Sequence, residues 1–149
     1  VAGSNAVIST LGSWHTREKN ILSSAMERLI PAMRNAHIMR IVSVTGAGAF
    51  TTSERHNLFE QANHALLNTV APKILRDAEA HIQLLEESGL DWTVIRSPVM
   101  TESGATKYTL GLASPLPWQT IHRYAVADCL VTLVQGTDYA MEAPFITRN

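Results

Sequence analysis

Three short apolar runs, each followed by glycine, serine or proline, constrain the fold of this chain most. They cover residues 5–10, 41–45 and 91–96, and they are rich in β-branched residues, which favours buried strands. Between them, residues 19–36 and 74–88 place apolar side chains at three- and four-residue steps, as amphipathic helices do. Because alternating strands and helices produce a parallel sheet covered on both faces, we predict a doubly wound α/β fold.

Capping and turn residues indicate where the other helices and strands begin and end. Ser53 predicts the start of a helix over residues 54–70, because serine caps helix N-termini. Pro31 is expected to kink or shorten the first helix, since proline lacks a backbone donor. Pro72 suits the first turn of the next helix and Gly89 suits its end. Short strands are also predicted at residues 107–110, 119–121 and 144–147, and a helix at 122–134.

Composition narrows the class of protein. A length of 149 residues suits one domain over residues 1–149, and 46% hydrophobic with 17% charged residues excludes a disordered chain. Twelve Lys+Arg against thirteen Asp+Glu leave no basic excess for a nucleic acid partner. The single Cys129 excludes a disulfide framework. No apolar run or amino-terminal segment resembles a membrane span or secretory signal, so we expect no membrane partner and a cytoplasmic location.

The carboxyl ends of the three main strands predict a binding edge, because ligands of open parallel sheets settle there. Each end combines small or hydroxyl residues with exposed backbone, which suits hydrogen bonds to a sugar, a phosphate or an amide. The alternative is that glycine and serine end parallel strands simply because the chain must turn. The three ends are residues 9–12, 43–46 and 97–100.

The motifs of several catalytic classes are missing. Gly46 and Gly48 form a close pair, but no third glycine completes the Gly-x-Gly-x-x-Gly loop that lets a pyrophosphate approach bare backbone. No tyrosine precedes a lysine by four positions, no nucleophile elbow occurs, and the six histidines lack metal-site spacing. We therefore assign no catalytic residue and no metal ligand. Lys73 and Arg76 lie near the place where a relay lysine would sit, with solvation as the alternative role.

Residues 85–98, Leu-Glu-Glu-Ser-Gly-Leu-Asp-Trp-Thr-Val-Ile-Arg-Ser-Pro, resemble the helix–strand unit of atypical short-chain dehydrogenases. They are most similar to the NAD(P)H-binding branch that includes NmrA-like proteins and the biliverdin and flavin reductases. Residues 6–12 look like that family's fourth strand with its loop, and residues 40–46 like its fifth. Residues 104–110 and 121–128 match its substrate-side loop and following helix, so the resemblance covers nearly the whole chain.

The resemblance implies a Rossmann-like fold and a nicotinamide cofactor, NADP or NAD, at the predicted edge. Lys73 or Arg76 corresponds loosely to the lysine of related members. The implied contacts lie at the three strand ends: Thr10, Leu11 and Gly12 toward the middle of the cofactor, Ser43, Val44 and Thr45 along the nicotinamide site, and Pro98, Val99 and Met100 beside the nicotinamide amide.

The resemblance also implies that the chain begins at the family's fourth strand. The first βαβαβ half, with its Gly-rich loop, would then lie outside these residues, and the opening on Val1 agrees with that expectation. Each backbone hydrogen bond to a charged pyrophosphate contributes about 1.5–3 kcal/mol. We therefore expect negligible dinucleotide turnover from 149 residues alone.

Two functions stay open at this stage. The first is an NAD(P)H-dependent reductase acting on a flavin, a quinone or a small carbonyl compound, in which the protein mainly orients the cofactor and excludes water. The second is a non-catalytic remnant of a Rossmann domain that binds or interacts as an oligomer. A half-sheet exposes a strand edge that invites pairing, so we expect a homo-oligomer in either case.

Overall fold

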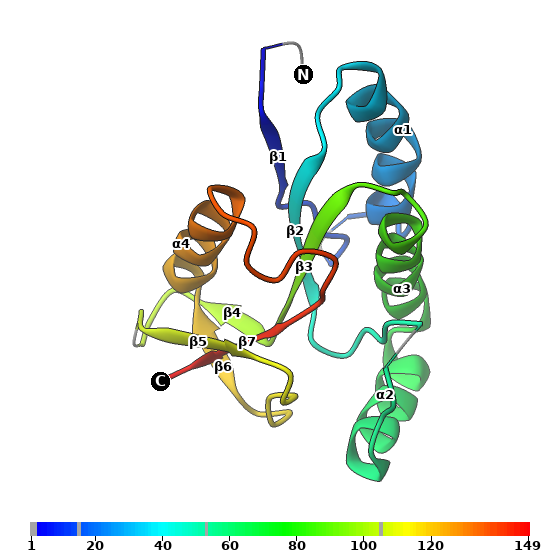
Figure 1. The fold of residues 1–149 in the computed structure, drawn as a ribbon. Helices are drawn as coiled ribbons and strands as arrows, with labels where there is room; N and C mark the ends of the chain where they lie inside the picture. Colours follow the sequence, from blue (N-terminus) through cyan, green and yellow to red (C-terminus); the bar gives the residue numbers. More distant parts are fainter. Residues whose placement is uncertain (1–2, 15, 53, 105) are drawn as a thin grey trace.

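The computed structural model describes residues 3–14, 16–52, 54–104 and 106–149 (Figure 1). Four helices and seven strands follow one another along this part of the chain. Their bounds are β1 Ala6–Ser9, α1 Ile21–Asn35, β2 Arg40–Gly46, α2 Leu58–Val70, α3 Pro72–Glu86, β3 Asp91–Ser97, β4 Val99–Thr101, β5 Tyr108–Gly111, β6 Thr120–His122, α4 Arg123–Val134 and β7 Phe145–Arg148.

Five strands form the main sheet in the order β1-β2-β3-β7-β5. The first four are parallel, with Ser9 beside Ser43 and Gly46 beside Ser97, which confirms the predicted α/β, Rossmann-like architecture. β5 departs from the expected all-parallel sheet, because it runs antiparallel to β7 at the edge. Such a reversed edge strand is common on otherwise parallel sheets. β4, which the sequence did not predict, pairs with β6 in a separate two-stranded sheet.

Helices cover both faces of the main sheet, as predicted (Figure 1). Successive β2 residues point to opposite faces, so Ile41 packs in one core and Val42 in the other. α1 and α3 cover the first face, with Met26 and Ile82 fully buried between them and the sheet. α4 covers the second face. Full burial of an apolar side chain such as Met26 or Ile82 contributes about 1.5–3 kcal/mol to the free energy of unfolding. The two cores therefore hold the helices on the sheet.

α1 continues past Pro31 to Asn35, so the predicted shortening at this proline is wrong. Pro31 lies on the exposed side of the helix. At the end of the helix, the backbone N–H of Ala36 donates to the carbonyl of Ala32 at 3.1 Å, so the last turn closes despite the donor that proline lacks.

α2 begins at Leu58, four residues later than predicted, and Ser53 lies outside the described residues. Its true cap is Asn57, whose side chain accepts from the backbone N–H of Glu60 while the Glu60 carboxylate accepts from the N–H of Asn57. This reciprocal capping box satisfies two donors, which a single serine cannot do. α2 has no buried residue and rests on α3.

α3 begins with Pro72 in its first turn, as predicted. It ends at Glu86 with Glu87 as its C-cap, so Gly89 lies in the turn to β3 and is not the helix cap that the sequence predicted. Gly89 has φ of +67°, a left-handed conformation that glycine adopts without steric cost. The turn returns the chain to the amino end of β3.

Arg96 is a fully buried cation in β3. Its guanidinium donates to both carboxylate oxygens of Glu54 at 2.7 and 2.6 Å and to the carbonyl of Ala143 at 2.7 Å. It also stacks on the Phe145 ring, 3.8 Å from the centroid. One side chain thereby ties the segment after β2 and the start of β7 to the end of β3.

Candidate functional site

The carboxyl ends of β1, β2 and β3 lie along one edge of the sheet, because the three strands are parallel and in register. The backbone N–H of Ala47 donates to the carbonyl of Ser97 at 2.8 Å, which fastens the end of β2 to the end of β3. α1 and α3 both begin at this edge, since each connects the carboxyl end of one strand to the amino end of the next.

The residues that the sequence assigned to this edge divide into two groups. An exposed group lies at or beyond the strand ends: Thr10, Leu11, Gly12 and Val99, with the half-buried Pro98 and Met100 beside them. A buried group lies within β2. Ser43 faces α3, Val44 packs with α4 on the opposite face, and Thr45 is 7% exposed near the strand end.

Two glycines leave the backbone open at this edge. A Cβ added at Gly12 or at Gly46 meets no protein atom within 4 Å, so a ligand can approach the main chain at both strand ends. Four hydroxyl oxygens are buried without a hydrogen-bond partner within the described residues: those of Ser9, Ser13 and Thr45 near these strand ends, and that of Thr51 farther along the loop after β2. Open backbone and unsatisfied hydroxyls suit a ligand that carries amide and sugar groups.

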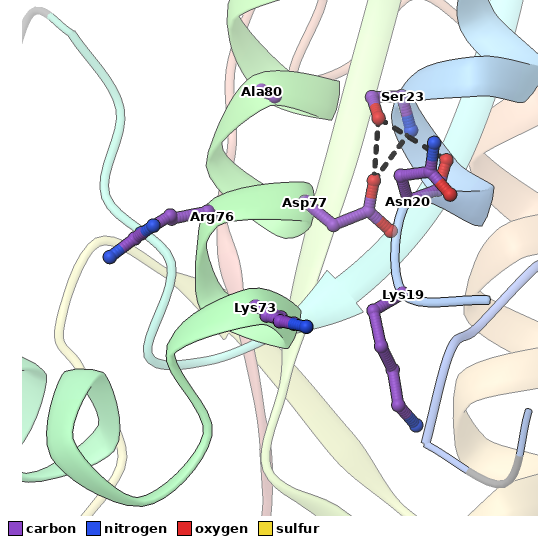
Figure 2. A pocket seen from close by; sticks show the side chains of 7 residues that line it. All are labelled: Lys19, Asn20, Ser23, Lys73, Arg76, Asp77 and Ala80. Atoms are coloured by element: carbon purple, nitrogen blue, oxygen red, sulfur yellow. Dashed lines mark hydrogen bonds between the residues drawn. The ribbon is translucent and has the colours of Figure 1, made fainter. Parts of the chain in front are cut away.

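A cleft of about 430 Å³ opens between the first turns of α1 and α3 (Figure 2). Three cationic side chains line it, and Figure 2 shows Lys73 extending from α3 toward Lys19, while Arg76 points to the other side. The remaining lining residues are Asn20, Ser23, Asp77 and Ala80.

Asp77 fixes the geometry of this cleft by joining its two walls, α1 and α3. It is 4% exposed, and its carboxylate accepts from the backbone N–H of Leu22 at 3.0 Å and of Ser23 at 2.9 Å. The Ser23 hydroxyl donates to the same carboxylate at 2.7 Å. α1 has no cap from its own N-cap residue, so a carboxylate of α3 satisfies its first donors and compensates its positive end.

A buried polar pair lies beneath the cleft wall. Ser43 Oγ and His81 Nε2 are 3.0 Å apart, and both side chains are almost completely buried. Burial lowers the pKa of His81 to about 4, against the smaller opposing influence of Asp77, so the imidazole is neutral at physiological pH. Since no solvent or substrate reaches this pair, it supports the sheet edge from within.

Sequence reasoning found Lys73 and Arg76 but missed Lys19 and Asp77 as parts of the same cleft. Lys19 lies two residues before the start of α1, and Asp77 is an acidic residue on the buried side of α3. An acid within an apolar stripe was the available signal, because such a group must find donors when it is buried.

Metal binding and thiol chemistry receive no support from the described residues. Within residues 3–14, 16–52, 54–104 and 106–149, no cluster of three His, Cys, Asp or Glu side chains has a geometry suited to a metal ion. Burial raises the pKa of Cys129 to about 12, so this thiol is not a nucleophile at neutral pH. None of the described helices is both long and apolar enough to span a bilayer.

Solved structures share this fold at low sequence identity. A candidate NAD-dependent epimerase/dehydratase from Bacillus halodurans superposes with a TM-score of 0.79 at 17% identity, over 97% of this chain and 64% of its own. A candidate NADH-flavin reductase from Streptococcus pneumoniae gives 0.70 at 17%, over 99% and 73%. A short-chain dehydrogenase/reductase from Veillonella parvula, in complex with NADP, gives 0.70 at 14%, over 98% and 64%.

The chain therefore spans about two thirds of the length of these structures. No curated protein is similar enough in sequence to count as a match. The model of the NAD(P)H-binding family matches residues 1–137, nearly the whole chain. With a parallel sheet whose strand ends meet at one open edge, the chain belongs to the NAD(P)H-binding family and has the fold of the atypical short-chain dehydrogenases.

Proposed function

We propose that this chain forms the nicotinamide side of an NAD(P)H site and serves a reductase whose acceptor is a flavin, a quinone or a small carbonyl compound. The observation that carries the proposal is the open backbone at Gly12, in the loop after β1, and at Gly46, the last residue of the neighbouring parallel strand β2. This is the edge where Rossmann-type sheets bind ligands. When bound, the nicotinamide supplies a hydride. The protein's task is to hold the ring at the acceptor and exclude water.

The exposed strand ends carry the binding role in this proposal. Thr10, Leu11 and Gly12 would contact the central part of the cofactor, and Pro98, Val99 and Met100 would flank the nicotinamide amide. Thr45 would line the ring site, with Ser43 and Val44 supporting it from inside the sheet. Lys73 adds a cation at the same edge.

The donor set suits the nicotinamide and its ribose better than it suits the pyrophosphate. Unsatisfied hydroxyls and open main chain match amide and sugar groups. A glycine-rich phosphate loop does not occur in the sequence. We therefore expect the 149-residue chain to bind reduced nicotinamide mononucleotide about as tightly as it binds NADPH.

Replacing Gly46 tests the site without disturbing the fold. The Cβ of a Gly46→Val variant would meet no protein atom, so the variant should fold normally while its side chain occupies the space of the ligand. We expect at least about a tenfold loss of affinity for NADPH and for reduced nicotinamide mononucleotide, or roughly 1.4 kcal/mol. Quenching of the exposed Trp14 and Trp118 gives a direct titration.

Gly111→Val in β5 is the matched control, because a Cβ there also meets open space but lies two strands beyond β3 in the sheet. The control should bind as the unaltered chain does. If the unaltered chain shows no saturable binding of either nucleotide, or if Gly46→Val binds as well as Gly111→Val, the proposal is wrong.

A second candidate is the non-catalytic oligomeric binding protein. The outer edge of β1 pairs with no other strand of the described residues, and this favours association through that edge. The two candidates differ in nucleotide binding, because only the first requires saturable binding of NADPH or reduced nicotinamide mononucleotide. The second requires self-association without such binding.

A further inference from the structure

The cleft between α1 and α3 concentrates positive charge on a chain whose net charge is −1. Lys19, Lys73 and Arg76 line it, and Asp77 is the one carboxylate among its lining residues in the described part of the chain. None of these three cations takes part in an ion pair within the described residues. A cleft with surplus cations suits an anionic ligand.

The carboxylate of Asp77 does not cancel this charge. Its oxygens already accept three hydrogen bonds, two from the backbone of α1 and one from the Ser23 hydroxyl. The amino-terminal end of α1 therefore compensates Asp77. Because Asp77 is buried below the cleft while Lys73 and Arg76 are exposed on its rim, an incoming anion meets the cations first.

The two walls hold their cations in different ways. Lys19 Nζ donates to the carbonyl of Ser13 at 3.0 Å and of Trp14 at 3.3 Å, so it is fixed to the loop after β1. Lys73 extends from α3 toward it (Figure 2). The first turn of α3 has no side-chain cap, since its N-cap residue is Ala71. Its free backbone donors therefore add to the positive character of this wall.

We propose that this cleft binds a phosphate group, held chiefly by Lys73 and the free backbone donors of the first turn of α3, with Lys19 on the facing wall. Arg76 points to the other side and contributes only its charge. Donors from two elements suit the multiple oxygens of a phosphate better than a single carboxylate does. The source of this phosphate rests on the proposed function. It is either a phosphorylated acceptor or the nicotinamide nucleotide, because both ligands would reach this edge of the sheet.

Titration with inorganic phosphate and pyrophosphate tests the cleft directly. We expect saturable shifts of the backbone amide signals of Lys73, Ile74 and Ser23 in a ¹H–¹⁵N spectrum, at ionic strength held constant with chloride. Lys73→Gln should weaken binding about five- to tenfold, whereas Lys73→Arg should retain it. Arg28→Gln removes an exposed charge of α1 outside the cleft and should change nothing.

Two ligand pairs distinguish the sources of the phosphate. A preference for riboflavin 5′-phosphate over riboflavin that Lys73→Gln abolishes assigns the cleft to the acceptor. A preference for nicotinamide mononucleotide over nicotinamide riboside that the same variant abolishes assigns it to the cofactor. Absence of phosphate binding, or equal binding by Lys73→Gln and the unaltered chain, overturns the inference. If phosphate binds the cleft while NADPH does not bind at all, the inference stands and the proposed function fails.

Discussion

At the scale of single residues, Asp77 and His81 lie one turn apart on α3 and have different roles. Asp77 is a buried charge with three donors, and it joins α1 to α3. His81 is a buried neutral ring whose Nε2 lies against Ser43 of β2 and whose Nδ1 has no partner among the described residues. Burial removes the solvation of the charged imidazole, whose second N–H would find no acceptor at Nδ1, and this explains the lowered pKa.

His81 should make the free energy of unfolding depend on pH. Its pKa is about 4 in the folded chain against 6.5 for an unperturbed histidine, so between these values the unfolded chain binds a proton that the folded chain does not. The contribution is complete above pH 6.5 and is lost as the pH falls toward 4, at about 1.4 kcal/mol per pH unit. Urea titrations at several pH values measure this slope.

His81→Gln is the comparison for this prediction, because an amide keeps a polar contact for Ser43 but does not titrate. Its stability should depend less steeply on pH over the same interval. An identical slope for both chains would show that His81 is not the group responsible.

At the scale of elements, α2 is the helix held most weakly. It buries no side chain, whereas α1, α3 and α4 each bury several. Its attachment is polar and aromatic instead. The Phe50 ring stacks on His56 and His64, and His64 Nε2 lies 2.7 Å from Glu79 of α3. Helices without buried apolar contacts open at low free energy.

Glu79→Gln should loosen α2 selectively. The variant weakens the contact to His64 and the hydrogen bond from the Phe50 backbone. If the free energy of opening of α2 falls by about 0.5–1 kcal/mol, the amides of residues 58–70 should exchange about two- to fivefold faster. Hydrogen exchange followed by mass spectrometry measures it. Glu87→Gln, an exposed acid beyond the end of α3, is the control and should leave that segment unchanged.

The elements also show what the sequence could and could not predict. The three central strands and the helices α1, α3 and α4 were predictable, because their apolar periodicity reflects the faces they bury. The start of α2 was not, since Ser53–Glu54 and Asn57–Glu60 both look like caps and only the second closes a reciprocal box. β4 was missed because Pro98 marks the end of β3, and the residues directly after it were assigned to the binding edge.

At the scale of the whole molecule, α1 and α3 cover one face of the sheet and α4 covers the other. The outer edge of β1 pairs with no strand in the part of the chain that the structure describes. The common edge of the three strand ends was predictable from parallel topology alone. The cleft was not, because it joins Lys19 to Lys73 and Arg76 across more than fifty residues of sequence. Its members come together only when two helices pack on the same face.

The free edge of β1 should cause self-association. Ile8 is 39% exposed in this edge strand, and unpaired backbone groups beside it favour pairing with a second copy. We expect a mass above that of a monomer by size-exclusion chromatography with light scattering at micromolar concentration. Ile8→Lys should shift the mass toward the monomer, because a charge on an edge strand opposes pairing.

Val131→Lys, at an exposed position of α4, is the matched control and should leave the mass unchanged. A monomeric mass for the unaltered chain would rule out association through this edge.

The guanidinium of Arg96 couples parts of the chain that are remote in sequence. Glu54 and Ala143 both bind this buried cation, and removing the Glu54 carboxylate leaves an uncompensated buried charge, which costs about 3–5 kcal/mol when both partners are buried and less here because Glu54 is partly exposed. The loop that borders the binding edge and the final strand should therefore melt in a single cooperative step. A substitution near the carboxyl terminus can then displace the loop after β2, and with it the proposed nucleotide site, although the two segments are far apart in the sequence.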